Sequence, residues 1–151
     1  MNLVLLVFSL IFIFWGSGKD IIVLITIIVV NFFCGLFIFK STNQFTRKLF
    51  LIFSITVSIG MLFFFKYSLF FAQNAFYVLD WLNITWDIPE QINSIILPLG
   101  ISFYTFQALS YTIDVYYNKV EETKNFIDFS LYVSFFPQLI AGPIVRYRDI
   151  N

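Results

Sequence analysis

The chain has 151 residues, of which 60% are hydrophobic, 22% are aromatic and only 12% are charged, whereas a soluble domain carries about 25% charged residues. Such a sequence cannot cover a water-exposed surface with polar groups, and its hydrophobicity excludes a disordered chain. Nine basic and nine acidic residues balance, which gives no indication of a nucleic-acid partner, so the composition predicts an integral membrane protein.

Three apolar runs occupy the first half of the chain. They cover residues 3–15, 21–39 and 49–65, and Lys19-Asp20 separates the first two. At 1.5 Å per residue, the second and third are long enough to cross about 30 Å of hydrocarbon. The first could barely span it, and only if the whole uncharged stretch from Met1 to Gly18 is counted. A cleaved signal peptide is the alternative for residues 1–18, although no basic residue precedes its apolar core.

The connection between the second and third runs sets the predicted orientation. It contains three basic residues and no acidic one: Lys40, Arg47 and Lys48. By the positive-inside rule this connection is cytoplasmic. Alternation along the chain then puts Met1 inside, Lys19 outside, Trp86 outside and Lys119 inside.

The region after the third run is rich in aromatic residues. The run ends at Lys66, and the predicted outer region extends from about Tyr67 to Gln91. It begins as an amphipathic aromatic stretch that ends near Tyr77. Aromatic rings of this kind suit the boundary between membrane and water.

The fourth apolar element covers residues 92–117 and carries polar side chains on one side. Pro98 near its start fits the first turn of a helix or a kink in a longer one. Six residues spaced three or four apart fall within an arc of roughly 80° on one helix face. They are Gly100, Tyr104, Gln107, Tyr111, Asp114 and Asn118.

This polar stripe should face protein or a wet cavity, because lipid satisfies no amide, phenol or carboxylate. Two interpretations remain open: a structural seam that pairs with another helix, or the lining of a substrate path. Asp114 lies near the helix end, where a carboxylate reaches the interface. Gln107 lies in mid-helix and is the stronger functional candidate.

The fifth element covers residues 126–145 and is predicted to be broken or re-entrant. Pro137 and Gly142-Pro143 each remove a backbone donor, so a straight helix through both is not expected. Re-entry would return Arg146 and Arg148 to the cytoplasmic side. There they serve either as an interfacial anchor or as a fork for an anionic donor.

The 151 residues carry little chemistry of their own. Histidine is absent, and the single cysteine, Cys34, cannot form an intrachain disulfide. No nucleophile–base pair, zinc spacing, phosphate loop or carboxylate dyad can be assembled. Physical reasoning from the residues ends at a membrane domain with a buried polar stripe and a broken helix.

Four sequence runs resemble the membrane-bound O-acyltransferase family. They are LPLGISFYTFQ at 97–107, SYTIDVY at 110–116, NFIDF at 125–129 and FFPQLIAGPIVRYRDI at 135–150. They are similar to the bacterial branch that contains alginate O-acetyltransferase and the D-alanyl transfer protein of teichoic acid. The likeness is dense over residues 95–150, and residues 1–94 agree only as a hydrophobic outline.

The resemblance implies an all-α polytopic membrane helix bundle in the bacterial inner membrane, with about four transmembrane helices plus the broken helix. Residues 1–151 would be the N-terminal part of one membrane domain that continues beyond residue 151. The implied reaction moves an acyl group, often acetyl, onto a hydroxyl of an envelope polysaccharide. The acyl donor would be an acyl-CoA or an acyl carrier, with no bound cofactor and no metal.

The family's essential histidine lies downstream of these motifs, so no catalytic residue is expected here and the isolated chain should be inactive. Seven residues are candidates for lining the family's substrate funnel: Tyr104, Gln107, Tyr111, Asp114, Gln138, Arg146 and Arg148. Two other functions remain open. One is a transporter or flippase fragment that uses the broken fifth element, although no second Pro-Gly-interrupted segment is present. The other is a small accessory membrane protein whose stripe docks a partner helix.

Overall fold

The computed structural model describes residues 2–81 and 98–135, and every regular element within these ranges is a helix. In chain order the elements are α1 (Asn2–Ser17), the short 3-10 helix η1 (Gly18–Asp20), α2 (Ile21–Lys40), α3 (Gln44–Trp81), α5 (Ile101–Tyr116) and α6 (Phe126–Ser134). The helical class is thus confirmed for this part of the chain. Two stretches, Asn2–Lys40 and Gln44–Ser68, are long and apolar enough to cross a membrane. The count of about four spans stays a prediction.

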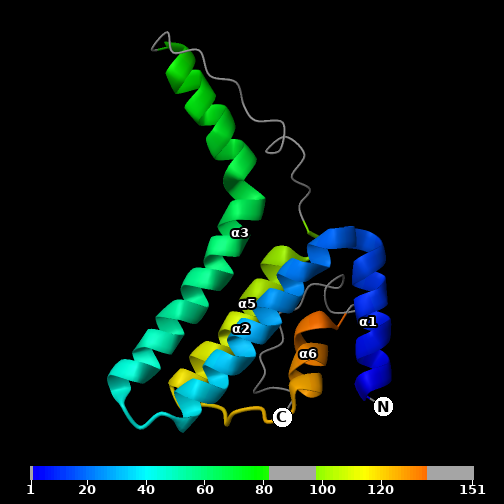
Figure 1. The fold of residues 1–151 in the computed structure, drawn as a ribbon, viewed down its shortest axis with the longest axis vertical. Coiled ribbons are helices and arrows are strands. Elements are labelled where there is room, and N and C mark those ends of the chain that lie inside the picture. The colour runs from blue at the N-terminus through cyan, green and yellow to red at the C-terminus, as the bar shows by residue number, and fades with distance from the viewer. Residues whose placement is uncertain (1, 82–97, 136–151) are drawn as a thin grey trace.

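α2 is the central helix of the bundle. It forms an antiparallel hairpin with α1 through η1, where Gly18 turns the chain with a φ of 56°. α2 also contacts α3, α5 and α6 (Figure 1). Its apolar residues Leu24, Ile27 and Ile38 are completely buried. The predicted division of residues 3–39 into two elements is therefore confirmed, with the break at Lys19 and Asp20.

Hydrogen bonds join the ends of the helices at two opposite ends of the bundle. At one end Asn2 Nδ2 donates to Asp128 Oδ1 at 2.8 Å, and Arg47 donates to the Tyr116 carbonyl at 2.8 Å. At the other end the Leu99 amide donates to Ser17 Oγ at 3.0 Å. The described helix ends therefore alternate between the two ends of the bundle as the sequence predicts. The assignment of these ends to the two sides of a membrane stays a prediction.

α3 differs from its predicted length. The apolar run ends at Lys66, but the helix continues to Trp81 and extends beyond the rest of the bundle (Figure 1). A charged residue limits a membrane span without stopping a helix, and no Gly or Pro lies between Met61 and Trp81. The predicted amphipathic stretch that begins at Tyr67 is thus part of the same helix.

α5 is shorter at both ends than the predicted fourth element. Pro98 lies before the helix rather than in its first turn, and Gly100 is the N-cap in the left-handed region, with φ 73°. At the other end Asn118 has φ 54°, and its amide bonds to the Val115 carbonyl while the Lys119 amide bonds to that of Asp114. This is a Schellman motif. Gly100 and Asn118 thus terminate α5 instead of belonging to its polar face.

α6 forms only the first part of the predicted fifth element. Its N-cap is Asn125, whose Oδ1 accepts a hydrogen bond from the Ile127 amide at 3.0 Å. The helix ends at Ser134, three residues before Pro137, and Phe135 is extended with ψ 105°. An early end agrees with the predicted break, since Pro137 cannot donate to the Val133 carbonyl. The predicted re-entry itself lies outside the described residues.

Candidate functional site

The four stripe residues that lie within α5 all face the protein interior. Tyr104 and Gln107 are each 1% exposed, Tyr111 is 0% exposed and Asp114 is 7% exposed. The expectation that this face turns away from lipid is thus met in the structure. Asp114 is buried near the end of α5, and its position at a membrane interface stays a prediction.

Gln107 links two helices. Its Nε2 donates a 2.7 Å hydrogen bond to the carbonyl of Tyr132 in the last turn of α6. The last four carbonyls of a helix have no partner within it, so an amide from α5 satisfies one of them. This contact is the interhelical pairing that the seam interpretation requires.

Tyr111 holds the loop between α5 and α6. Its hydroxyl accepts a hydrogen bond from the Thr123 amide at 3.0 Å, and its ring lies 4.6 Å from that of Phe129. The ring also packs against Gly35 of α2 so closely that a Cβ there would lie 2.7 Å from Tyr111 Cε1. Gly35 therefore makes room for the buried phenol.

Tyr104 differs from its neighbours in the stripe. Its hydroxyl is buried and makes no hydrogen bond within the described part of the chain. A buried hydroxyl without a partner costs free energy, about 1–3 kcal/mol. Among the stripe tyrosines, Tyr104 is therefore the one whose polar group the fold does not use.

A second polar cluster lies in the bundle core, and sequence reasoning missed it. Asn31 is fully buried, and its Oδ1 accepts from Ser54 at 2.7 Å and from Thr112 at 2.8 Å. Its Nδ2 donates to Ser58 Oγ and to the Ile27 carbonyl, both at 2.9 Å. One amide thus uses two donors and two acceptors to join α2, α3 and α5. The sequence feature that points to this cluster is the single asparagine within the apolar run 21–39.

Arg47 also has a role beyond its charge. Its guanidinium donates to the Tyr116 carbonyl at 2.8 Å and to Asn118 Oδ1 at 2.7 Å, and it lies 5.7 Å from the centre of the Tyr116 ring. A cation at the C-terminus of a helix interacts favourably with its dipole and last carbonyls. One of the three basic residues that predict the orientation therefore also caps α5.

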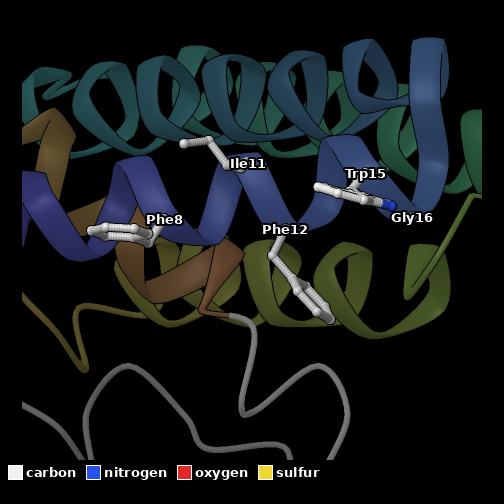
Figure 2. Close-up of a pocket in the computed structure, with 5 residues that line it drawn as sticks. All are labelled: Phe8, Ile11, Phe12, Trp15 and Gly16. Atoms are coloured by element: carbon white, nitrogen blue, oxygen red, sulfur yellow. The ribbon is translucent and has the colours of Figure 1, made fainter.

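An apolar hollow of about 510 Å³ lies on α1. Figure 2 shows its lining: Phe8, Ile11, Phe12, Trp15 and Gly16. None of these side chains carries a group for acid–base or nucleophilic chemistry. The hollow is therefore an apolar surface without a catalytic group.

The remaining candidates, Gln138, Arg146 and Arg148, lie outside the described residues. Within the described ranges, no group of three or more His, Cys, Asp or Glu side chains could hold a metal ion. The part of the site that the structure brings together is thus the face of α5 from Tyr104 to Asp114, with its contacts to α2 and α6.

Comparisons with known proteins decide the family. The chain is 36% identical over 151 residues to a probable alginate O-acetylase of Pseudomonas aeruginosa, and this match covers 99% of the chain. It is 33% identical to a peptidoglycan O-acetyltransferase of Helicobacter pylori, over 94% of the chain. The chain belongs to the bacterial branch of the membrane-bound O-acyltransferase family.

This family membership confirms the resemblance carried by the four sequence runs. A further relative, a probable alginate O-acetylase of Pseudomonas fluorescens, is 50% identical over 62 residues, or 41% of the chain. The acyltransferase-family chain spans 28% of the Pseudomonas aeruginosa relative and 30% of the Helicobacter pylori relative. No family model and no solved structure matches it.

Proposed function

We propose that this chain is part of a membrane enzyme that transfers an acyl group, most simply acetyl, to a hydroxyl of a cell-envelope polysaccharide. One observation carries the proposal: almost the whole chain is 33–36% identical to proteins named alginate O-acetylase and peptidoglycan O-acetyltransferase. The apolar helices support a location in the bacterial inner membrane, with the bilayer as a partner.

The proposed reaction is an acyl exchange. The acceptor hydroxyl oxygen attacks the acyl carbonyl carbon and forms a new ester bond, while the bond from that carbon to the donor breaks. The hydroxyl proton passes to the departing donor group. General acid–base catalysis of such a transfer needs a base within hydrogen-bond reach. The 151 residues contain no histidine, so an imidazole base would come from outside them.

We infer that residues 2–81 and 98–135 supply the scaffold of the enzyme rather than its reacting groups. The Asn31 cluster joins α2, α3 and α5, and Gln107 joins α5 to α6. Hydrogen-bonded contacts of this kind fix the positions of helices in a low-dielectric interior. The donor, an acyl-CoA or acyl carrier, is anionic, and Arg146 and Arg148 are proposed to bind it.

Deletion and complementation test the proposed function. The gene that contains residues 1–151 is deleted, and ester-linked acyl groups are released from envelope polysaccharide by mild alkali and quantified. We expect the deletion strain to lose these esters and the intact gene to restore them. Unchanged esters with polysaccharide retained inside the cell would support a transporter instead. Unchanged esters and unchanged export of the polysaccharide would support an accessory membrane protein.

A further inference from the structure

The outward surface of α3 is mostly apolar from Phe45 to Phe71. Its exposed large apolar residues recur at intervals of three or four along most of the helix, which places them on one face. They are Phe45, Leu49, Ile52, Phe53, Ile59, Phe63, Phe64, Tyr67, Phe70 and Phe71. Ser54, Ser58 and Leu62 of the same helix are buried on the other side. α3 is thus an edge helix with one face against the bundle and one open face.

Cationic and aromatic side chains mark two levels along α3. At the lower level Arg47 lies 5.7 Å from the centre of the Tyr116 ring, and Lys119 lies 5.6 Å from that of Tyr117. At the upper level Lys66 lies 5.6 Å from the centre of the Tyr67 ring. Basic residues and tyrosines together are typical of the two membrane–water interfaces.

The distance between these levels matches a bilayer. Arg47 and Lys66 are 19 residues apart (66 − 47), which corresponds to about 29 Å of helix rise, against about 30 Å of hydrocarbon. Phe70 and Phe71 lie four and five residues beyond Lys66, or about 6–8 Å, within the headgroup layer. The aromatic residues past Lys66 therefore fall at the depth that such rings favour.

We propose that the open face of α3 is the surface through which this domain contacts bilayer lipid, with hydrocarbon between Arg47 and Lys66 and with Phe70 and Phe71 among the headgroups. The inference rests on the membrane location proposed above. Lipid is the occupant because the face between the two levels exposes mostly apolar side chains, and each level has a cation–aromatic pair.

Spin-label accessibility tests this surface in the intact protein reconstituted in phospholipid vesicles. Single cysteines replace Thr56 near the middle of the open face and Phe71 beyond Lys66, on a Cys34→Ser background. Leu62, buried on the opposite side of α3, is the matched control. Each nitroxide is measured against oxygen, which partitions into lipid, and against a water-soluble nickel complex.

We expect a label at Thr56 to collide with oxygen several-fold more than one at Leu62, and to be inaccessible to nickel. A label at Phe71 should collide with both reagents. Low accessibility of Thr56 to both reagents would show that a protein segment covers the face, and high nickel accessibility would show water there. Either result overturns the inference. Polysaccharide acylation measured in parallel separates such a failure from failure of the proposed function.

Discussion

Gln107 Nε2 and the carbonyl oxygen of Tyr132 are 2.7 Å apart, and their hydrogen bond ties the middle of α5 to the last turn of α6. This carbonyl precedes the segment that contains Pro137, where the helix has already ended. Gln107 therefore holds the point at which the chain leaves α6. Its contact within the fold favours the seam interpretation of this side chain over a direct role on substrate.

Gln107→Leu is expected to lower the protein level and the acyl transfer together. The substitution keeps a similar volume but leaves the Tyr132 carbonyl without this donor. The expected cost is about 0.6 kcal/mol for an average hydrogen bond between membrane helices, and about 1–3 kcal/mol if the buried carbonyl is left unsatisfied. Thermal unfolding in detergent and quantitative blotting measure the effect. Ser110→Ala is the control, since within the described residues Ser110 Oγ bonds only to the Gln107 carbonyl of its own helix. Lost transfer with unchanged stability would instead support the interpretation that Gln107 lines the substrate path.

Asn31→Leu should destabilise the protein more than any single hydroxyl deletion around it. The change leaves Ser54, Ser58 and Thr112 without their amide partner in the core, and each unsatisfied buried group costs about 1–3 kcal/mol. Thr112→Val should cost less, because it removes only one of the four hydrogen bonds of Asn31, together with the 3.3 Å bond from Thr112 Oγ1 to the Ala108 carbonyl. A double-mutant cycle between the two substitutions measures the coupling by unfolding. Purely additive effects would contradict the four-bond arrangement around Asn31.

The two polar sets differ in how far the sequence reveals them. The stripe from Tyr104 to Asp114 follows the period of a single helix, so local spacing is sufficient to predict it. The Asn31 cluster joins three helices, and its partners can be named only once the neighbours of α2 are known. The end of α3 was missed for another reason: Lys66 reports membrane depth, whereas helix termination requires a cap or a breaker. The spacing of three or four residues also includes Gly100 and Asn118, although these two residues lie at the ends of α5 and not within the helix.

Gly35→Ala should be markedly destabilising, whereas Gly60→Ala should not. A Cβ at Gly35 would lie 2.7 Å from Tyr111 Cε1, and the Tyr111 side chain is completely buried and held by the Thr123 amide and the Phe129 ring. Overpacking of this kind costs typically about 1–3 kcal/mol. Gly60 lies in α3 with no atom within 4 Å of such a Cβ, so alanine should stabilise the helix by up to about 1 kcal/mol. Equal unfolding temperatures for the two variants would contradict the close contact.

Single cysteines at Lys48 and Lys119 should react from the same side of the membrane, opposite to one at Lys19. The three side chains are exposed, and the bundle places the first two near one end and Lys19 near the other. By the positive-inside rule the Lys48 side is cytoplasmic. An impermeant thiol reagent on intact cells, with a Cys34→Ser background, measures the orientation. Lys48 is used rather than Arg47, since Arg47 caps α5. Labelling of Lys48 from outside would invert the predicted topology.

Tyr104→Phe and Tyr111→Phe form a matched pair, because both remove one hydroxyl from a buried tyrosine of the same helix face. The Tyr111 hydroxyl accepts from the Thr123 amide, so its loss should cost about 0.5–1.5 kcal/mol and expose the loop that precedes α6. The Tyr104 hydroxyl makes no hydrogen bond within the described residues, so Tyr104→Phe should leave stability unchanged or slightly higher. Thermal unfolding and hydrogen exchange of the loop distinguish the two.

The same pair separates a substrate role from a structural one. If Tyr104 lines the substrate path, Tyr104→Phe should lower acyl transfer at an unchanged protein level, since its hydroxyl makes no hydrogen bond within the described bundle. In Tyr111→Phe, by contrast, transfer should fall only as far as the amount of folded protein does. For each variant, the transfer per amount of protein is the ester content divided by the immunoblot signal, measured in complemented deletion strains. Full transfer by Tyr104→Phe would remove this residue from the candidate site and leave the face of α5 as a scaffold surface.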